Sequence, residues 1–333
     1  MLTVLPQIEQ EIREANHILL IPHQHPDGDA LGSCTAFMEY LGDLNKRHTA
    51  YCATAISPRL SYLAHSNRVT ADDAIWQDPT IDLIIVFDSG DLRYAGVADK
   101  IAQQPTSARI INFDHHVTNE RYGHLNFVLT QASSTAEVLY HFFTGIHIPI
   151  NINMATSLLT GVLTDTDNFT NAATSGNTLT IGHHLLLRGA DIKTITASVF
   201  KDKTVNTLKL WGVILTRLQK HEELDLAYTY ILQSDLIEYN VSESDLEGIA
   251  NYTNNTPDAR ITLVLKELVD GKVKGSFRTT QADTDVAVIA KSLNGGGHKK
   301  AAGFTVSGPM SQAIAQIVGQ MKTIGGYESP LQK

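Results

Sequence analysis

The chain has 333 residues, of which 43% are hydrophobic and 18% charged, a composition that excludes long disordered segments and fibrous repeats. This length suggests two domains of about 150 residues each. The 26 lysines and arginines against 35 aspartates and glutamates leave a formal net charge of −9, which argues against a broad basic face for duplex DNA. A short or small anion can still bind through a local cationic pocket or a bound metal.

The sequence lacks the signals of secretion and of membrane insertion. Cys34 and Cys52 are too few for a disulfide framework and too far apart for a CxxC site. No apolar run approaches the roughly 20 residues of a membrane-spanning helix, and the first residues lack the order of a signal peptide. We therefore expect reduced thiols and a cytoplasmic protein that does not bind a membrane.

Short apolar runs alternate with amphipathic stretches in the first half of the chain. Strands are predicted at 17–21, 82–87 and 109–113, and helices at 30–42, 134–143 and 154–163. Strands that alternate with helices indicate an α/β fold with a parallel sheet. We expect this first domain to span residues 1–190.

The pattern changes after about residue 190. An amphipathic helix is predicted at 204–221, because Leu208, Trp211, Leu215 and Leu218 fall on one stripe. Strands follow at 226–232, 261–265 and 272–277, with helices at 244–251, 286–293 and 311–323. We expect residues 191–222 to form a linker region around the long helix, and residues 223–333 to form a second, smaller α/β domain.

Acidic residues and histidines follow the apolar runs of the first half. HILLI leads into the segment 22–29, DLIIVF into Asp88, RIINF into the triplet 114–116, and LLTGVLT into Asp165. In an open parallel sheet the carboxyl ends of the strands meet in one crevice. Counting these as four strand ends, we expect six side chains to converge: His23, Asp27, Asp29, Asp88, His115 and Asp165.

Several carboxylates in one crevice repel one another unless cations offset their charge. Oxygen and imidazole donors without thiolates suit a hard or borderline ion, Mn²⁺ or Mg²⁺. Six ligands suit two ions about 3.5–4 Å apart that share a carboxylate, and Asp88 is the natural bridge. Gly28 is expected to let Asp27 and Asp29 point toward neighbouring ions.

Some of these residues also have simpler interpretations. Asp29 precedes a predicted helix and would serve there as an ordinary N-cap. The run 133–135 is interpreted as a capping segment, with a phosphate contact as the alternative. For Arg93, which follows Asp88, a phosphate contact is likewise the alternative to a structural role. His183 and His184 lie in a leucine-rich helix and are interpreted as ordinary helix surface and core.

Together these motifs resemble one known family. HQHPDGDALGS at 23–33, Asp88 in FDSGDLR, the triplet at 114–116 and LTDTDNF at 163–169 resemble the four motifs of the DHH phosphoesterases. GGGHKKAAG at 295–303 resembles the signature of the DHHA1 domain that accompanies them. The length is similar to that of the compact NrnA-type oligoribonucleases, whereas RecJ-type exonucleases are larger.

The resemblance implies a role for each matching residue. One Mn²⁺ would be held by His23, Asp27 and Asp88, and the other by Asp29, Asp88, His115 and Asp165. Catalysis would depend on Asp88, Asp165 and His116, with His116 near the leaving group. Asp167 departs from the family, where glycine is frequent, and is expected to cap the next turn. His25 is not assigned as a ligand.

The second domain is expected to hold a substrate phosphate. Glycines let backbone N–H groups approach an anion closely, and an arginine can hold phosphate oxygens by two hydrogen bonds. The resemblance likewise implies substrate binding by Arg278 and by a loop of Gly295, Gly296, Gly297 and His298. Lys299 and Lys300 are left open between phosphate contacts and solvated surface.

These residues predict two-metal hydrolysis of a phosphoester. The resemblance implies short single-stranded RNA and 3′-phosphoadenosine 5′-phosphate as substrates, and it leaves a homodimer open. The alternative substrate is a cyclic dinucleotide or its linear product. An inorganic pyrophosphatase is less favoured because GGGHKKAAG indicates a different second domain. A non-catalytic nucleotide-binding regulator is less favoured because the ligand motifs are complete.

Overall fold

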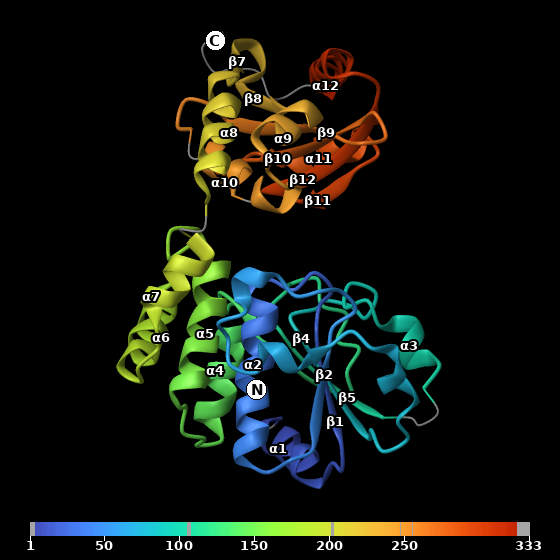
Figure 1. The fold of residues 1–333 in the computed structure, drawn as a ribbon, viewed down its shortest axis with the longest axis vertical. Coiled ribbons are helices and arrows are strands. Elements are labelled where there is room, and N and C mark those ends of the chain that lie inside the picture. The colour runs from blue at the N-terminus through green and yellow to red at the C-terminus, as the bar shows by residue number, and fades with distance from the viewer. Residues whose placement is uncertain (1–3, 105–107, 201–202, 247, 255, 325–333) are drawn as a thin grey trace. The chain divides into compact units, whose positions relative to one another are not determined.

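The computed structural model describes residues 4–104, 108–200, 203–246, 248–254 and 256–324. The chain divides into two compact units, Met1–Asp202 and Lys203–Lys333 (Figure 1). None of the helices in these described ranges is long and apolar enough to cross a membrane. Cys34 and Cys52 are both buried free thiols.

The first unit is built on a six-stranded sheet in the order β3-β2-β1-β4-β5-β6. Its hydrogen-bonded strand pairs are parallel, as the sequence predicts. The strands are β1 Ile18–Pro22, β2 His48–Tyr51, β3 Val69–Thr70, β4 Leu83–Phe87, β5 Arg109–Asp114 and β6 Leu125–Val128. The strand order reverses between β1 and β4, and open α/β sheets bind their ligands at such a switch point.

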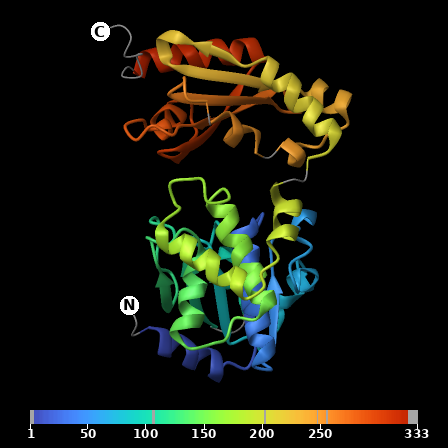
Figure 2. The ribbon, with the colours of Figure 1, turned by 90° about the vertical axis from the view of Figure 1, so that its left-hand side faces the viewer.

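Helices pack on this sheet and bury its central strands (Figure 2). They are α1 Leu5–Glu14, α2 Gly28–Asp43, α3 Ala98–Ala102, α4 Thr135–Gly145, α5 Ile152–Asp165, α6 Gly176–Leu187 and α7 Ile192–Ile195. Short 3₁₀ helices lie at Pro58–Leu60, Ser66–Arg68 and Asp73–Gln77, and a π-helix lies at Thr196–Phe200. Phe37 of α2 contacts the rings of Phe87, Phe113, Phe142 and Phe143. Trp76 and Val97 belong to the core on the other face, so β1 and β4 are apolar throughout.

Helices α2 and α5 approach each other closely because glycines line their contact. A Cβ atom on Gly28 would lie 2.4 Å from Cγ2 of Thr164, and one on Gly161 would lie 2.5 Å from Oδ1 of Asp29. The steric reason for Gly28 is therefore the contact with α5, rather than the separation of two metal ligands that the sequence suggested.

The close contact with α2 sets the position of Asp165, the last residue of α5. The predicted helix at 154–163 is present, but counting Asp165 as a fourth strand end was wrong. Asn151 caps this helix, since its Oδ1 accepts a hydrogen bond from the backbone N–H of Met154 at 3.0 Å. A short apolar run such as LLTGVLT does not distinguish a buried helix from a buried strand.

The second unit is built on a mixed sheet in the order β11-β12-β10-β9-β8-β7. Its strands are β7 Gln219–His221, β8 Leu226–Ile231, β9 Ile261–Glu267, β10 Lys272–Arg278, β11 Gly296–His298 and β12 Ala301–Ser307. Strands β8 and β9 are parallel and the other pairs are antiparallel. The glycine-rich segment predicted as a loop is thus largely an edge strand, because Gly296–His298 pair with β12.

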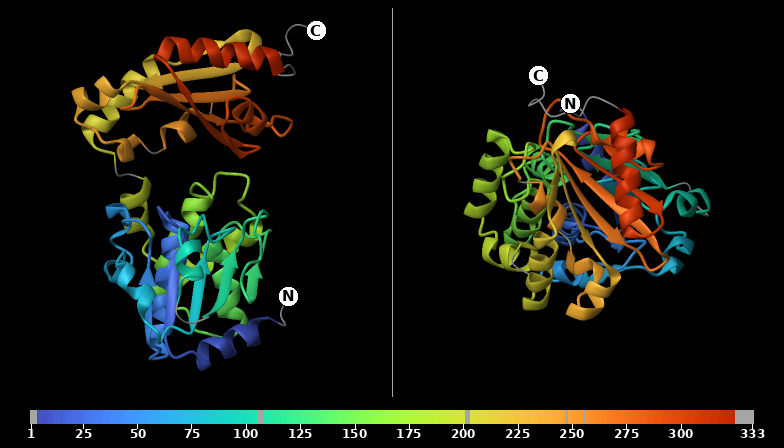
Figure 3. Two further views of the ribbon diagram at one scale, coloured as in Figure 1. Left: turned by 90° about the vertical axis from the view of Figure 1, so that its right-hand side faces the viewer. Right: turned by 90° about the horizontal axis from the view of Figure 1, so that it is seen from above.

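Helices lie on both faces of this second sheet. They are α8 Val205–Thr216, α9 Gln233–Tyr239, α10 Ile249–Thr253, α11 Val286–Ser292 and α12 Met310–Ile324. Helices α11 and α12 pack around Phe277 on one face, and α8, α9 and α10 pack around Val264 on the other. Figure 3 shows α12, the red helix, lying against the sheet.

Two helices of the second unit differ from the prediction. The helix predicted at 204–221 ends at Thr216, because Gln219–His221 pair with β8 instead. The helix predicted at 244–251 is interrupted: a 3₁₀ turn at Glu243–Leu246 precedes α10, and Gly248 before α10 has φ +92°. A left-handed backbone does not continue a helix.

Candidate metal centre

The carboxylate of Asp88 lies at the centre of the switch point between β1 and β4. Asp88 follows β4 and has a left-handed backbone, with φ +56°. Its backbone N–H donates to the carbonyl of Phe113 at 3.0 Å. Oδ2 of Asp88 lies 3.5 Å from Nε2 of His23, and Oδ1 lies 3.5 Å from Nε2 of His115. Each oxygen of one carboxylate thus faces a different histidine, an arrangement that suits a bridge between two cations.

Three groups of donor atoms lie around this carboxylate. Within each group the donor atoms lie within 4.8 Å of one another: His23, Asp27 and Asp88 in one, Asp29, His115 and Asp165 in another, and Asp88, Asp114, His115 and His116 in a third. Nε2 of His115 also lies 3.2 Å from Oδ2 of Asp165. The structure therefore brings together all six side chains that the sequence analysis expected to converge.

Four carboxyl groups and two imidazoles meet in this cluster, so acidic groups are in excess. Burial, and then the charge of Asp88, raises the pKa of Asp29 well above its ordinary value. Burial also raises the pKa of Asp165 to about 6, although its hydrogen bond with His115 opposes the change. Burial disfavours the charge on His115, but hydrogen bonds with Asp165 and Asp88 raise its pKa to about 12. Oxygen and imidazole donors with this excess of acid fit divalent cations.

The start of α4 forms a layer behind the cluster that the sequence did not predict. Ser134 caps this helix, as expected for the run 133–135, because its Oγ accepts from the backbone N–H of Glu137 at 3.0 Å. The backbone N–H groups of Thr135 and Ala136 donate to the two carboxylate oxygens of Asp29, at 2.6 and 2.8 Å. The positive end of the helix dipole therefore faces an expected metal ligand.

These contacts decide between the two interpretations of Asp29. The residue that caps α2 is Asp27, whose Oδ1 accepts from the N–H groups of Asp29 and Ala30 at 2.9 and 3.0 Å. Asp29 is fully buried, and its carboxylate is bound by α4. The interpretation of Asp29 as an ordinary N-cap of its own helix is therefore wrong.

A buried network orients His116, the second histidine after β5. Nδ1 of His116 lies 2.7 Å from Oδ1 of Asp114, which is fully buried. Nδ2 of Asn119 donates to Oδ2 of Asp114 at 2.5 Å and to Oδ1 of Asn112 at 2.8 Å. Asp114 thus orients the imidazole and Asn119 holds Asp114. The sequence analysis missed Asn119, although its place three residues after His116 in the same loop was a usable signal.

Two family descriptions match this chain. Residues 17–162 match the DHH family, N-terminal domain, and residues 224–324 match the DHHA1 domain. The chain belongs to the DHH–DHHA1 phosphoesterase family. The DHH match ends before Asp165, so the place of this residue in the cluster rests on the packing of α5.

The curated relatives and a solved structure cover nearly the whole chain. The chain is 29% identical over 314 residues to "Bifunctional oligoribonuclease and PAP phosphatase NrnA" of Thermus thermophilus, covering 93% of this chain and 91% of the relative. It is 26% identical to a probable NrnA of Streptococcus mutans, covering 91% and 93%. An exopolyphosphatase-related protein of Bacteroides fragilis shares the fold, with a TM-score of 0.90, 22% identity, and coverage of 97% and 96%.

The DHHA1 domain carries the residues expected to bind phosphate. Arg278 pairs with Ala301, and Ala301 pairs with His298, so the three lie in one row on one face of the sheet. A guanidinium nitrogen of Arg278 donates to the carbonyl of Phe277 at 3.0 Å, and no acidic side chain in the described part of the chain pairs with it. Burial lowers the pKa of Arg278. A half-buried cation without an acidic partner is a ready binding point for an anion.

Packing within the hairpin explains two of the three glycines in this signature. Cβ atoms on Gly295 and Gly297 would lie 2.2 and 2.6 Å from carbonyl oxygens of β12, whereas Gly296 faces open space. The ammonium of Lys300 contacts the carbonyl of Gln281, and Lys299 is exposed at the turn. Close strand pairing therefore accounts for Gly295 and Gly297 without a phosphate.

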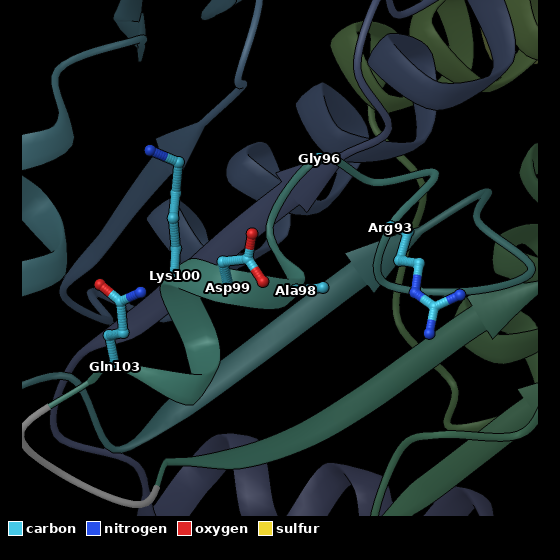
Figure 4. A pocket seen from close by; sticks show the side chains of 6 residues that line it. All are labelled: Arg93, Gly96, Ala98, Asp99, Lys100 and Gln103. Carbon is cyan, nitrogen blue, oxygen red and sulfur yellow. The ribbon is translucent and has the colours of Figure 1, made fainter.

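A pocket in each domain adds to this picture. In the DHH domain a pocket of about 620 Å³ carries Arg93 and Lys100 at opposite ends (Figure 4), and Lys100 pairs with Asp73 at 2.6 Å. Its lining contains none of the six cluster residues. In the DHHA1 domain a pocket of about 340 Å³ is lined by apolar side chains that include Val264 and by the charged residues Arg278, Lys266, Lys274 and Glu243.

The remaining histidines and Asp167 lie outside the groups of donor atoms found among the described residues. His184 hydrogen-bonds the hydroxyl of Tyr140 at 2.8 Å, which agrees with a structural role. Asp167 has φ +49°, and its backbone carbonyl accepts from the hydroxyl of Thr170 at 2.6 Å. The turn thus uses the backbone of Asp167, whereas we expected a cap.

Glu137 ties α4 to α6, and its replacement by glutamine is expected to destabilise the protein in a pH-dependent way. Burial would raise the pKa of Glu137, but hydrogen bonds from His141, Ser133 and Asn177 lower it to about 2. The difference from the ordinary value of 4.5 corresponds to about 3 kcal/mol of folding free energy. A lowered pKa stabilises the fold above about pH 4.5, and that stabilisation is lost as the pH falls toward 2.

Urea denaturation of wild type and Glu137→Gln at pH 7, 4 and 3 tests this prediction. The difference in unfolding free energy should be largest at pH 7 and should shrink at pH 4 and 3. Glu120→Gln, at an exposed carboxylate of the same unit, serves as the control and should change stability by less than about 0.5 kcal/mol. An equal loss for Glu137→Gln at all three values would show that the charge of Glu137 is not responsible.

Proposed function

We propose that this chain is a Mn²⁺-dependent two-metal phosphoesterase that hydrolyses short single-stranded RNA to mononucleotides, and 3′-phosphoadenosine 5′-phosphate to AMP. The observation that carries the proposal is the buried Asp88, whose Oδ2 faces His23 and whose Oδ1 faces His115 within an acidic cluster. The similarity to two NrnA proteins over nearly the whole chain supports the substrate class.

The donor atoms suit two divalent cations. One would be held by His23, Asp27 and Asp88, which form one group of donor atoms. The other would be held by the group of Asp29, His115 and Asp165 together with Asp88, whose Oδ1 lies 3.5 Å from Nε2 of His115. When bound, such ions lower the pKa of a coordinated water and offset the charge of the phosphate. The chain itself supplies a rigid frame for them, because α4 holds Asp29 from behind.

His116 acts on the leaving group in this proposal. Its Nδ1 is engaged by Asp114, so Nε2 is the nitrogen that remains for the leaving oxygen of the substrate. The side chain of His116 is 36% exposed to solvent, whereas that of Asp114 is fully buried. The network of Asp114 and Asn119 keeps the ring in a single orientation.

Arg278 binds a second phosphate or the end of the oligonucleotide, and it affects binding more than turnover. Arg278→Ala should raise KM for an RNA dinucleotide by about 10- to 100-fold, the cost of losing a charged hydrogen bond, with little change in kcat. Steady-state kinetics measure the two constants separately. Lys291→Ala, at an exposed lysine of α11, is the control and should leave both unchanged. A fall in kcat without a change in KM would contradict this role.

A hydrolysis panel with purified protein and Mn²⁺ tests the proposed function. The substrates are a linear RNA dinucleotide, a 5-nucleotide RNA, 3′-phosphoadenosine 5′-phosphate, cyclic di-AMP and pyrophosphate. Fast turnover of the linear RNAs with weak cyclic turnover supports the proposal. Preference for cyclic di-AMP would make the chain a cyclic dinucleotide phosphodiesterase, and cleavage of pyrophosphate alone would overturn the substrate class. Metal binding without turnover of any substrate would indicate a non-catalytic nucleotide-binding protein.

A further inference from the structure

The hydroxyl of Thr135 reaches the central carboxylate of the cluster from the side of α4. Its Oγ1 donates to Oδ1 of Asp88 at 2.9 Å, while its backbone N–H donates to Oδ2 of Asp29 at 2.6 Å. Thr135 and Asp29 are fully buried, and Asp88 is 3% exposed. One residue therefore contacts an expected ligand from each half of the cluster.

The position of this hydrogen bond determines which lone pairs of Asp88 remain. A carboxylate offers about four lone-pair sites, two on each oxygen. Thr135 occupies one site on Oδ1, the oxygen that faces His115 at 3.5 Å, and leaves Oδ2 to face His23. Because Thr135 is buried and its hydroxyl bonds one oxygen, rotation of the carboxylate would break that bond. The hydroxyl thus keeps one oxygen directed toward each histidine.

We propose that Thr135 is a positioning residue for a two-cation site, which it serves by fixing the carboxylate plane of Asp88. The proposal rests on the proposed function in taking the cluster to bind divalent cations. Residues that orient metal ligands in this way typically change metal affinity 10- to 100-fold when they are replaced. Thr135 is fully buried and its hydroxyl contacts Asp88, so its effect is expected in cation binding.

The start of α4 provides a matched control, because the capping role belongs to the neighbouring residue. Ser134 accepts from the N–H of Glu137, whereas the side chain of Thr135 donates to Asp88. Ser134→Ala removes the cap and should lower stability without lowering cation affinity. Thr135→Ala and Thr135→Ser both remove the methyl group but differ in the hydroxyl.

The experiment is a titration of the full chain, stripped of metal with a chelator, with Mn²⁺ in a calorimeter. Thr135→Ala and Thr135→Val should weaken Mn²⁺ binding by about 10- to 100-fold, whereas Thr135→Ser should stay within about threefold of wild type. Thermal unfolding of each metal-free variant reports stability separately. If Thr135→Val does not fold, the comparison of Ala with Ser at this position still isolates the hydroxyl.

The outcomes separate this inference from the proposed function. If wild type binds no Mn²⁺, the proposed two-metal function fails and this inference fails with it. If wild type binds Mn²⁺ and Thr135→Ala binds it as tightly as Thr135→Ser, only the inference is overturned. If Ser134→Ala weakens binding as much as Thr135→Ala, the effect comes from the helix start as a whole, and the inference is again overturned.

Discussion

Asp88→Asn is expected to lower kcat for a short RNA by about 10³-fold or more. Loss of a single group that stabilises charge in a transition state typically lowers kcat by about 10²- to 10³-fold, so this effect is at or beyond the upper end of that range. The amide keeps the shape of the side chain but replaces one of the two oxygens that face His23 and His115 with a donor. An amide nitrogen does not ligate a divalent cation, so the variant would lack the proposed bridge between two cations. Calorimetry should show weaker Mn²⁺ binding in the same variant.

Asp91→Asn is the matched control for this experiment. Asp91 lies in the same loop, but its Oδ1 accepts from the backbone N–H groups of Arg93 and Tyr94 at 2.8 Å. It belongs to none of the groups of donor atoms found among the described residues. Asp91→Asn should retain activity within a few-fold of wild type. Near-normal turnover by Asp88→Asn would show that the cluster is not the catalytic site.

Gly161→Ala is expected to destabilise the protein by about 1–3 kcal/mol and to weaken cation binding. The added Cβ would lie 2.5 Å from Oδ1 of Asp29 and 2.6 Å from Cβ of Ala136, both in the buried layer behind the cluster. Alanine favours a helix over glycine by about 1 kcal/mol, but overpacking against two buried groups outweighs that gain. The strain is relieved only by moving α5 or Asp29, and either movement changes the cluster.

Gly42→Ala controls for the change in helix propensity. Gly42 lies in α2, and a Cβ there would meet no atom within 4 Å. This variant should be as stable as wild type or more stable by up to about 1 kcal/mol. Thermal unfolding and Mn²⁺ titration of both variants test the prediction. If Gly161→Ala were as stable as Gly42→Ala and bound Mn²⁺ normally, close packing of α2 and α5 would not determine the site.

Three of the expected ligand positions could be predicted from local patterns because they depend on sheet topology. His23, Asp88 and His115 follow apolar runs that form β1, β4 and β5, and parallel strands carry their carboxyl ends to one edge. The strands β2, β3 and β6 were not predicted because each has only two to four residues. They form by pairing with neighbouring strands of the sheet, which a local pattern does not show. The glycine-rich signature predicted the type of the second domain. It did not predict that this glycine-rich segment pairs with β12 as an edge strand.

The sequence by itself determined the fold class, the family and the residue types of the cluster, since these follow from hydrophobic periodicity and from motifs within short segments. Only the tertiary structure decided how the cluster is completed. Asp165 enters from the end of a helix through glycine contacts between α2 and α5, and Thr135 enters from a different helix start. Asn119 acts through Asp114. Such contacts join side chains from separate elements, so their geometry depends on packing distances that no local pattern encodes.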